Sequence, residues 1–96
     1  MQLMQVVGTV VATQKDPKLD GLKLLIGKEI RLDGTMTETY HVAVDTVGVG
    51  QGEVVIIVRG SSARLTDVTD KKPVDTAIIG VVDEIEVAGS IVWQKE

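Results

Sequence analysis

Residues 45–64 read Asp-Thr-Val-Gly-Val-Gly-Gln-Gly-Glu-Val-Val-Ile-Ile-Val-Arg-Gly-Ser-Ser-Ala-Arg, and this stretch decides the fold. Glycines alternate at positions 48, 50 and 52, and an unbroken apolar segment follows them. Phosphate-binding glycine loops follow a strand and open a helix, so that backbone amides point at the anion. Here the glycine loop precedes a strand, and the next turn lacks the Gly-Lys-Ser/Thr of a P-loop and the further glycines of a dinucleotide fingerprint. The stretch therefore predicts an architectural element.

Segments rich in Val, Ile and Thr, separated by Gly, Asp and Pro, extend along the chain on both sides of this stretch. The pattern is typical of an all-β domain with short strands. Glycines in the middle of these segments, at Gly8, Gly27 and Gly80, favour the bulges and strong coiling that close a small barrel. We expect strands over residues 2–13, 22–32, 38–44, 53–59, 77–87 and 91–94.

The turns between these segments complete the predicted architecture. Asp33-Gly34 is a hairpin signal, and Ser61 is expected to cap a short helical turn that ends at Arg64 or Leu65. Ala88-Gly89-Ser90 turns the chain into the last strand. We expect a single domain over residues 1–96, all-β, folded as a small five-stranded OB-like barrel with a short helical turn after strand four and a C-terminal hairpin.

The charge of the chain excludes several classes of partner. Its formal net charge is −4, which argues against nucleic acid and against anionic membrane surfaces. The longest purely apolar run, Val54 to Val58, is far too short to span a membrane. The N-terminus lacks the features of a signal peptide, and the chain has no cysteine. We therefore expect a soluble cytoplasmic protein without a disulfide framework.

The apolar content indicates an oligomer. Hydrophobic residues make up 44% of the chain, yet Trp93 and Tyr40 are its only aromatic residues. A chain of 96 residues has a modest core, so a surplus of aliphatic side chains is expected to contact other subunits.

The titratable residues do not form a catalytic or metal-binding pattern. His41 has no neighbouring ligand residues for a metal site, and alternation along its strand predicts that it lies opposite Tyr40 and Val42, as a surface or interface histidine. Glu84 and Glu86, beside Asp83, are expected to form a solvated face or a protected sheet edge. The sequence therefore predicts a protein that is not an enzyme and holds no metal or cofactor.

Three further charged residues stand at strand ends or in tight turns: Arg59, Arg64 and Asp75. Arginines in such places can clamp an anion or lie across a subunit contact. We slightly favour interface ion pairs over plain solvent exposure, and keep anion binding as a minor option.

The chain closely resembles the bacterial microcompartment vertex proteins of the EutN/CcmL family. The resemblance covers nearly the whole chain. It departs at Val49, where family members often have alanine, and at residues 27–29, which interrupt a usually more apolar strand. The segments that carry it are Gly8-Thr-Val-Val-Ala-Thr-Gln-Lys15 with Asp16-Pro17, Leu22-Lys-Leu-Leu25, Val44-Asp-Thr-Val-Gly-Val-Gly-Gln-Gly-Glu53, Arg59-Gly-Ser-Ser-Ala-Arg64, Lys72-Pro-Val-Asp75 and Ala77-Ile-Ile-Gly-Val-Val-Asp83.

This resemblance implies a five-stranded barrel that assembles into a homopentamer, with hexameric and trimeric shell proteins as partners in the cytoplasm. The pentamer would cap the five-fold vertices of a polyhedral shell, where flat tiles alone cannot close the surface. Carried onto this chain, it offers the glycine loop and the turn after strand four as subunit contacts or as the lining of a central opening. With Asp75, the candidates are Gly48, Val49, Gly50, Gln51, Gly52, Arg59, Gly60, Ser61, Ser62, Ala63 and Arg64. The alternative is an oligomeric barrel that binds a small molecule or an anion through the glycine loop.

Overall fold

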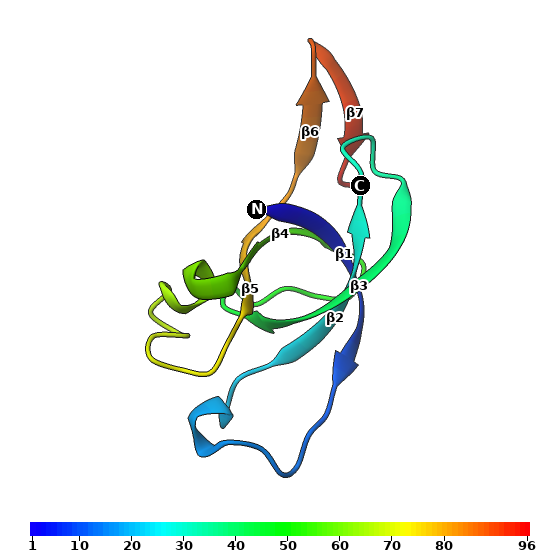
Figure 1. The fold of residues 1–96 in the computed structure, drawn as a ribbon. Coiled ribbons are helices and arrows are strands. Elements are labelled where there is room, and N and C mark those ends of the chain that lie inside the picture. The colour runs from blue at the N-terminus through cyan, green and yellow to red at the C-terminus, as the bar shows by residue number, and fades with distance from the viewer.

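The computed structural model describes all 96 residues, Met1–Glu96. Five strands close into a barrel in the order β1-β2-β3-β5-β4, and two more form a separate hairpin (Figure 1). This confirms the expected all-β barrel and C-terminal hairpin. The elements in chain order are β1 (Gln2–Val10), η1 (Pro17–Leu19), β2 (Leu24–Ile30), β3 (Met36–Asp45), β4 (Val54–Arg59), η2 (Gly60–Arg64), β5 (Thr76–Val81), β6 (Glu84–Val87) and β7 (Ser90–Gln94).

The barrel closes through a short parallel seam. β3 and β5 pair in parallel at Val44 with Ala77 and at Asp45 with Ile78, whereas all other strand pairs are antiparallel. The 3-10 helix η2 and the loop after it connect β4 to β5. The β6–β7 hairpin projects from one end of the barrel (Figure 1), and the molecule measures 45 × 23 × 22 Å.

The barrel interior is filled almost entirely by aliphatic side chains. A second cluster lies at the base of the hairpin, around Val82 and Ile85, and a third lies under η2, around Ala63 and Val74. The main interior cluster consists of Met4, Val6, Leu25, Ala43, Val49, Val55, Ile57 and Ile78. Because aliphatic side chains fill the interior, the candidate binding surfaces lie outside the barrel.

The mid-strand glycines coincide with irregularities in the barrel. The pairing of β1 with β2 shifts by a bulge between Val6 and Gly8, as expected for a glycine inside a strand. Gly80 pairs with Ile56, directly beside the shift in the β4–β5 register. Gly8 and Gly80 therefore lie at or beside register shifts, where mid-strand glycines are expected.

Several predicted boundaries are wrong. The segment 77–87 is not one strand: β5 ends at Val81 and β6 begins at Glu84. The backbone N–H of Val82 donates to the carbonyl of Val54, and the chain then leaves the barrel for the hairpin. The first two strands are shorter than expected, and β3 begins earlier, at Met36.

The predicted helical turn after strand four is present as η2, but Ser61 does not cap it. The residue that precedes η2 is Arg59, and no side chain makes a cap hydrogen bond there. Gly60 adopts a φ of +70°, a conformation that glycine reaches at little cost. The glycine therefore makes the turn that a serine cap was expected to make.

The facing of β3 is the reverse of the prediction. His41 and Ala43 are buried, whereas Tyr40 and Val42 are 58% and 52% exposed. Ala43 belongs to the interior cluster, and Glu29 provides a hydrogen-bond partner for the buried His41. Tyr40 and Val42 consequently lie on the outer surface, whereas Val44 is buried in the cluster under η2.

Candidate functional site

The glycine loop after β3 is organised by one carboxylate. The backbone N–H groups of Val47 and Gly48 donate to Oδ1 of Asp45 at 3.0 and 2.9 Å, and that of Val49 donates to Oδ2 at 2.9 Å. Gly48 has a φ of +82°, which lets successive amides converge in the manner of an anion-binding nest. The nest is occupied by the protein's own carboxylate, which disfavours the anion-binding alternative.

The end of the loop is held by Glu53. Its Oε1 accepts the backbone N–H of Gly50 at 3.1 Å, and its Oε2 lies 3.0 Å from Nζ of Lys95 near the C-terminus. The hydrogen bond from Lys95, followed by that from Gly50, lowers the pKa of the Glu53 carboxyl below its usual value. The loop is thus connected to the segment that follows β7.

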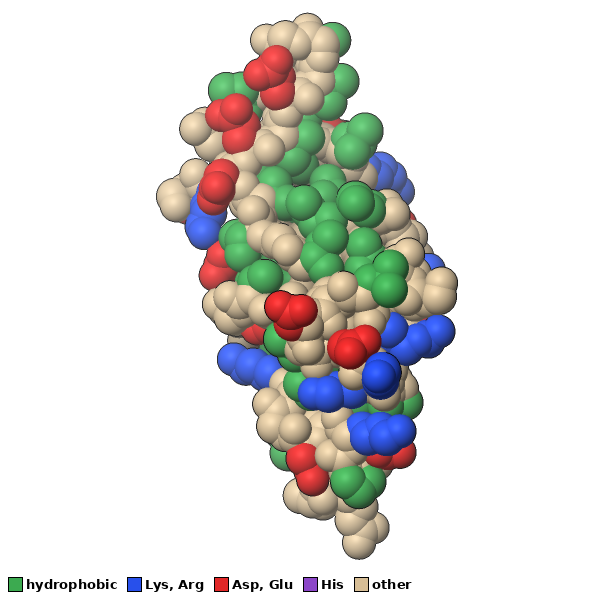
Figure 2. Space-filling view, turned by 90° about the vertical axis from the view of Figure 1, so that its left-hand side faces the viewer, with side chains coloured by type: hydrophobic (Ala, Val, Ile, Leu, Met, Phe, Trp, Pro, Cys, Tyr) green, Lys and Arg blue, Asp and Glu red, His purple; other side chains and the backbone are tan.

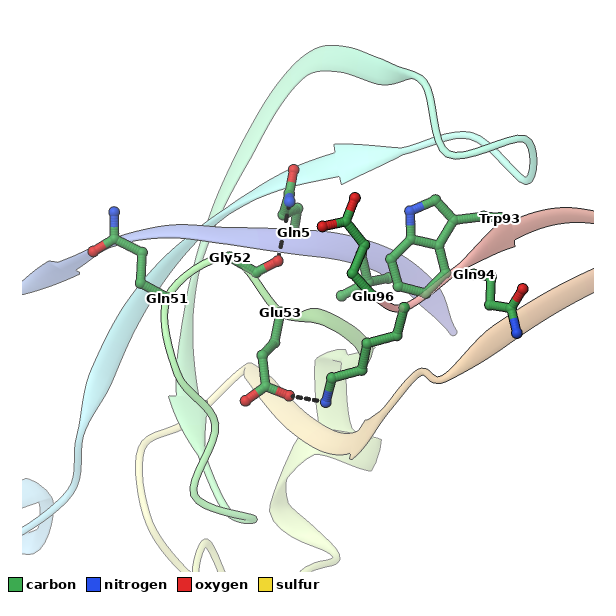
Figure 3. Close-up of a pocket in the computed structure, with 9 residues that line it drawn as sticks. Gln5, Gln51, Gly52, Glu53, Trp93, Gln94 and Glu96 are labelled. Carbon is green, nitrogen blue, oxygen red and sulfur yellow. Dashed lines mark hydrogen bonds and ion pairs between the residues drawn. The ribbon is translucent and has the colours of Figure 1, made fainter.

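A hollow of about 460 Å³ lies between the glycine loop and the end of β7 (Figure 3). Gln5, from β1, donates through Nε2 to the carbonyl of Gly52 at 3.0 Å, and Trp93 forms part of the wall with Gln94. The hollow is mostly polar, with three glutamine side chains among its lining, and it is the largest depression on the isolated subunit. Sequence reasoning missed it, because its sides come from three distant segments.

The turn after β4 is anchored from beneath. Ala63 is completely buried, and its carbonyl accepts the hydroxyl of Thr69 at 2.6 Å. Around this anchor Gly60, Ser61, Ser62 and Arg64 are exposed. The turn therefore presents a fixed polar surface.

The candidate residues fall into two groups at opposite ends of β4. Gly48 to Gly52 precede the strand, and Arg59 to Arg64 follow it. Asp75 joins the second group through its carbonyl, which accepts the backbone N–H of Gly60 at 2.8 Å. In the first group Gly48, Gly50, Gln51 and Gly52 are exposed. Val49 is buried in the barrel core, so any contact it makes with another subunit has to run through its backbone.

The charged candidates form no ion pair within the subunit. Arg59, Arg64 and Asp75 are exposed, and the salt bridges of the chain involve other residues. Their exposure is compatible both with contacts to a second chain and with plain solvent exposure.

His41 lies inside the barrel. Its Nε2 is 2.9 Å from Oε2 of Glu29, and the His41 side chain is 7% exposed. The predicted surface or interface position of His41 is therefore wrong. Glu84 and Glu86 are exposed, as predicted. No three His, Cys, Asp or Glu side chains come together as metal ligands, and no helix is long and apolar enough to cross a membrane.

Comparison with known proteins places this chain among shell proteins. The family described as "Ethanolamine utilisation protein EutN/carboxysome" matches residues 1–83. The carboxysome shell vertex protein CcmL of Nostoc sp. PCC 7120 is 42% identical, across 100% of this chain and 96% of the relative.

Two solved structures extend the likeness to three dimensions. That of Gloeobacter violaceus CcmL has a TM-score of 0.95 at 40% identity, across 99% of this chain and 98% of the other. The pentameric microcompartment shell protein GrpN of Rhodospirillum rubrum has a TM-score of 0.85 at 41% identity, across 92% of this chain and 100% of the other.

Proposed function

The chain belongs to the EutN/CcmL family, and on that premise we propose that it forms pentamers that cap the five-fold vertices of a polyhedral bacterial microcompartment. In this role the protein is structural, and what it contributes is its five-fold shape. Flat tiles cover the facets of such a shell, and a five-fold unit at each vertex supplies the curvature that closes the surface. The protein acts in this role by assembly and without catalysis, as part of a shell in the cytoplasm.

One observation carries this proposal: the fold overlaps the pentameric shell protein GrpN over the full length of that chain at 41% identity. At this level of identity the strand register and the outer surfaces of the barrel are expected to correspond closely. A closed ring of identical subunits needs a head-to-tail contact between two different surfaces of the same chain.

The outer surface of the barrel supports such contacts. Besides Tyr40 and Val42 on β3, Leu65 at the end of η2 is 85% exposed. Apolar side chains on an ordinary small monomer are mostly scattered singly, whereas here two lie on one strand face. Covering these side chains in a ring removes apolar surface from water, which stabilises the assembly by about 25 cal/mol for each Å² of apolar surface buried.

The two candidate segments at the ends of β4 are proposed to meet neighbouring subunits or to line the central opening. In the glycine loop, Gly50 is exposed, and a Cβ added there would lie 3.6 Å from Oε1 of Glu53, an ordinary contact. In the turn, Ser62 is exposed. Replacing Gly50 by Leu or Ser62 by Trp should therefore weaken the ring while the subunit still folds.

The decisive experiment is native mass spectrometry of the purified chain, followed by co-assembly with hexameric and trimeric shell proteins. We expect a species of five times the 10.3 kDa chain mass, and closed shells only when this chain is added to the tiles. A clean monomer or dimer over a wide range of concentration would contradict the proposal.

A further inference from the structure

Two rows of apolar residues run across the outer surface of the barrel. In the first, Leu3 on β1 pairs with Ile56 on β4, and Ile56 pairs with Gly80 on β5. We call these three residues the Leu3 row. They lie next to one another on adjacent strands, and none carries a charge.

The second row crosses a different part of the same barrel. Gly8 on β1 pairs with Ile26 on β2, and Ile26 pairs with Val42 on β3. We call these three residues the Val42 row. Like the Leu3 row, it spans three strands with an isoleucine in the middle and a glycine at one end.

Alternation along the strands shows that both rows face outward. Successive side chains of a strand point to opposite faces. Met4 and Leu25, which adjoin Leu3 and Ile26 in the chain, are in the interior cluster, as are Val55 and Ala43. Leu3 and Ile56 pack in part against the cluster at the base of the hairpin, but no member of either row is fully buried in the subunit. The apolar side chains of the rows therefore remain partly in water when the chain is alone.

The space-filling view is consistent with a large apolar area outside the barrel. Figure 2 shows a continuous band of hydrophobic side chains across the middle of one side of the molecule, with basic side chains below it. A band of this kind on a small acidic protein is typical of a surface that another chain covers.

We propose that the Leu3 row of one subunit packs against the Val42 row of the next subunit in the ring. This inference rests on the proposed pentamer and names the surfaces that form it. A ring of identical subunits requires two different surfaces that fit each other, and the two rows are different, similar in extent and on separate strand groups. Only β1 contributes to both, with Leu3 near one end and Gly8 near the other.

The glycines at the ends of the rows fit a close approach of two subunits. A Cβ added to Gly80 would lie 3.5 Å from Cδ1 of Ile56, and one added to Gly8 would lie 3.7 Å from Cδ1 of Ile26. Both are ordinary contacts, and neither glycine has a positive φ. The subunit's own packing therefore does not exclude a side chain at these two positions, and the space they leave is available to the neighbouring chain.

The test uses the absence of cysteine from the chain. The double variant Val42→Cys/Gly80→Cys carries one thiol in each row, and it is treated with a short bis-maleimide whose reach tolerates a small shift in register. Native mass spectrometry first establishes that the variant is still a pentamer. Denaturing electrophoresis should then show a ladder from two to five linked chains.

A matched control places the thiols outside both rows. Val11 and Leu32 are 87% and 62% exposed, so Val11→Cys/Leu32→Cys has two accessible thiols and should give no ladder. Each row cysteine alone should also give none, because different residues meet in a head-to-tail contact. An intact pentamer without a ladder, or an equal ladder from the control, would overturn the assignment of the rows. A chain that forms no pentamer at all would overturn the proposed function as well.

Discussion

Met4 on β1 fills the space that Gly27 leaves on β2. The thioether of Met4 occupies the position in which a side chain on Gly27 would begin. Met4 is fully buried in the barrel, and the φ of Gly27 is not positive. The glycine is therefore required by packing inside the barrel and not by an unusual backbone conformation.

This contact predicts that Gly27→Ala destabilises the subunit. The added methyl group has to displace Met4, which is enclosed by other core side chains, and overpacking of this kind costs about 1–3 kcal/mol. The control is Gly50→Ala, since a Cβ at Gly50 has only Glu53 within reach, at 3.6 Å; because Gly50 is also a proposed subunit contact, native mass spectrometry first establishes that both variants are in the same oligomeric state. Urea unfolding at equal chain concentration should separate the two variants, and equal stabilities would contradict the packing argument.

Removing the partner of His41 should cost more than removing an exposed ion pair on the neighbouring strand. Glu29→Ala leaves the buried Nε2 of His41 without the hydrogen bond it makes at 2.9 Å, and an unsatisfied buried polar group costs about 1–3 kcal/mol. The control is Glu38→Ala, because Glu38 is 95% exposed and lies 3.8 Å from Lys28. Such surface pairs contribute about 0–1 kcal/mol.

Thermal unfolding of the two variants at neutral pH checks this difference. If Glu38→Ala proved the more destabilising of the two, the role assigned to the internal pair would be wrong. His41→Gln provides a second comparison. Its side-chain amide can still donate a hydrogen bond to Glu29, so His41→Gln should destabilise the protein less than Glu29→Ala.

The hydrogen bonds that Asp45 accepts predict that its Ala and Asn variants destabilise the glycine loop to different extents. Asp45→Ala removes the acceptor of three backbone N–H groups, and by analogy with the loss of a capping side chain it should cost about 0.5–2 kcal/mol. Asp45→Asn keeps one oxygen, so its effect should be smaller. Hydrogen exchange of the Val47, Gly48 and Val49 amides should speed up in the same order, and unchanged exchange in the alanine variant would contradict the anchoring role.

The sequence predicts the architecture of this chain better than the facing of its side chains. Glycine and aspartate turns mark the strand ends because these residues are needed for local conformations, as Gly34 at φ +87° illustrates. Which side chains of β3 face the interior could not be predicted from β3 alone. His41 finds its hydrogen-bond partner in Glu29, a residue on another strand. The assumption that apolar residues face inward fails here, because Tyr40 and Val42 are 58% and 52% exposed while His41 is buried.

For the candidate site, the sequence predicted contiguous segments of the chain, but not the surfaces that strand pairing assembles from distant residues. The glycine loop and the Arg59–Arg64 turn are recognisable from local sequence, as are their exposed glycines and serines. The Leu3 and Val42 rows join residues up to 77 positions apart, from Leu3 to Gly80, through strand pairing. Only the register of the barrel brings them together, so no local pattern could reveal them.

The pair formed by Glu53 and Lys95 predicts a pH-dependent contribution to stability. The folded-state pKa of Glu53 is lowered below its unfolded value, mainly by the hydrogen bond from Lys95. Folding therefore favours the ionised carboxylate, and the stabilisation is present in full above the unfolded pKa of about 4.3. It is lost as the pH falls through the folded pKa. Wild type should exceed Lys95→Gln in melting temperature at pH 7, and the difference should disappear under more acidic conditions.

Asp33 provides the internal reference for this measurement. Its pKa is also lowered, by hydrogen bonds from the hydroxyl and the backbone N–H of Thr35 and by the charge of Arg31. Asp33 titrates in both proteins, so its contribution cancels in the difference. Salt should reduce the difference at pH 7, because both partners are partly exposed and salt screens such pairs. A difference that persists at a pH where Glu53 is fully protonated would show that Lys95 stabilises the fold through contacts other than this carboxylate.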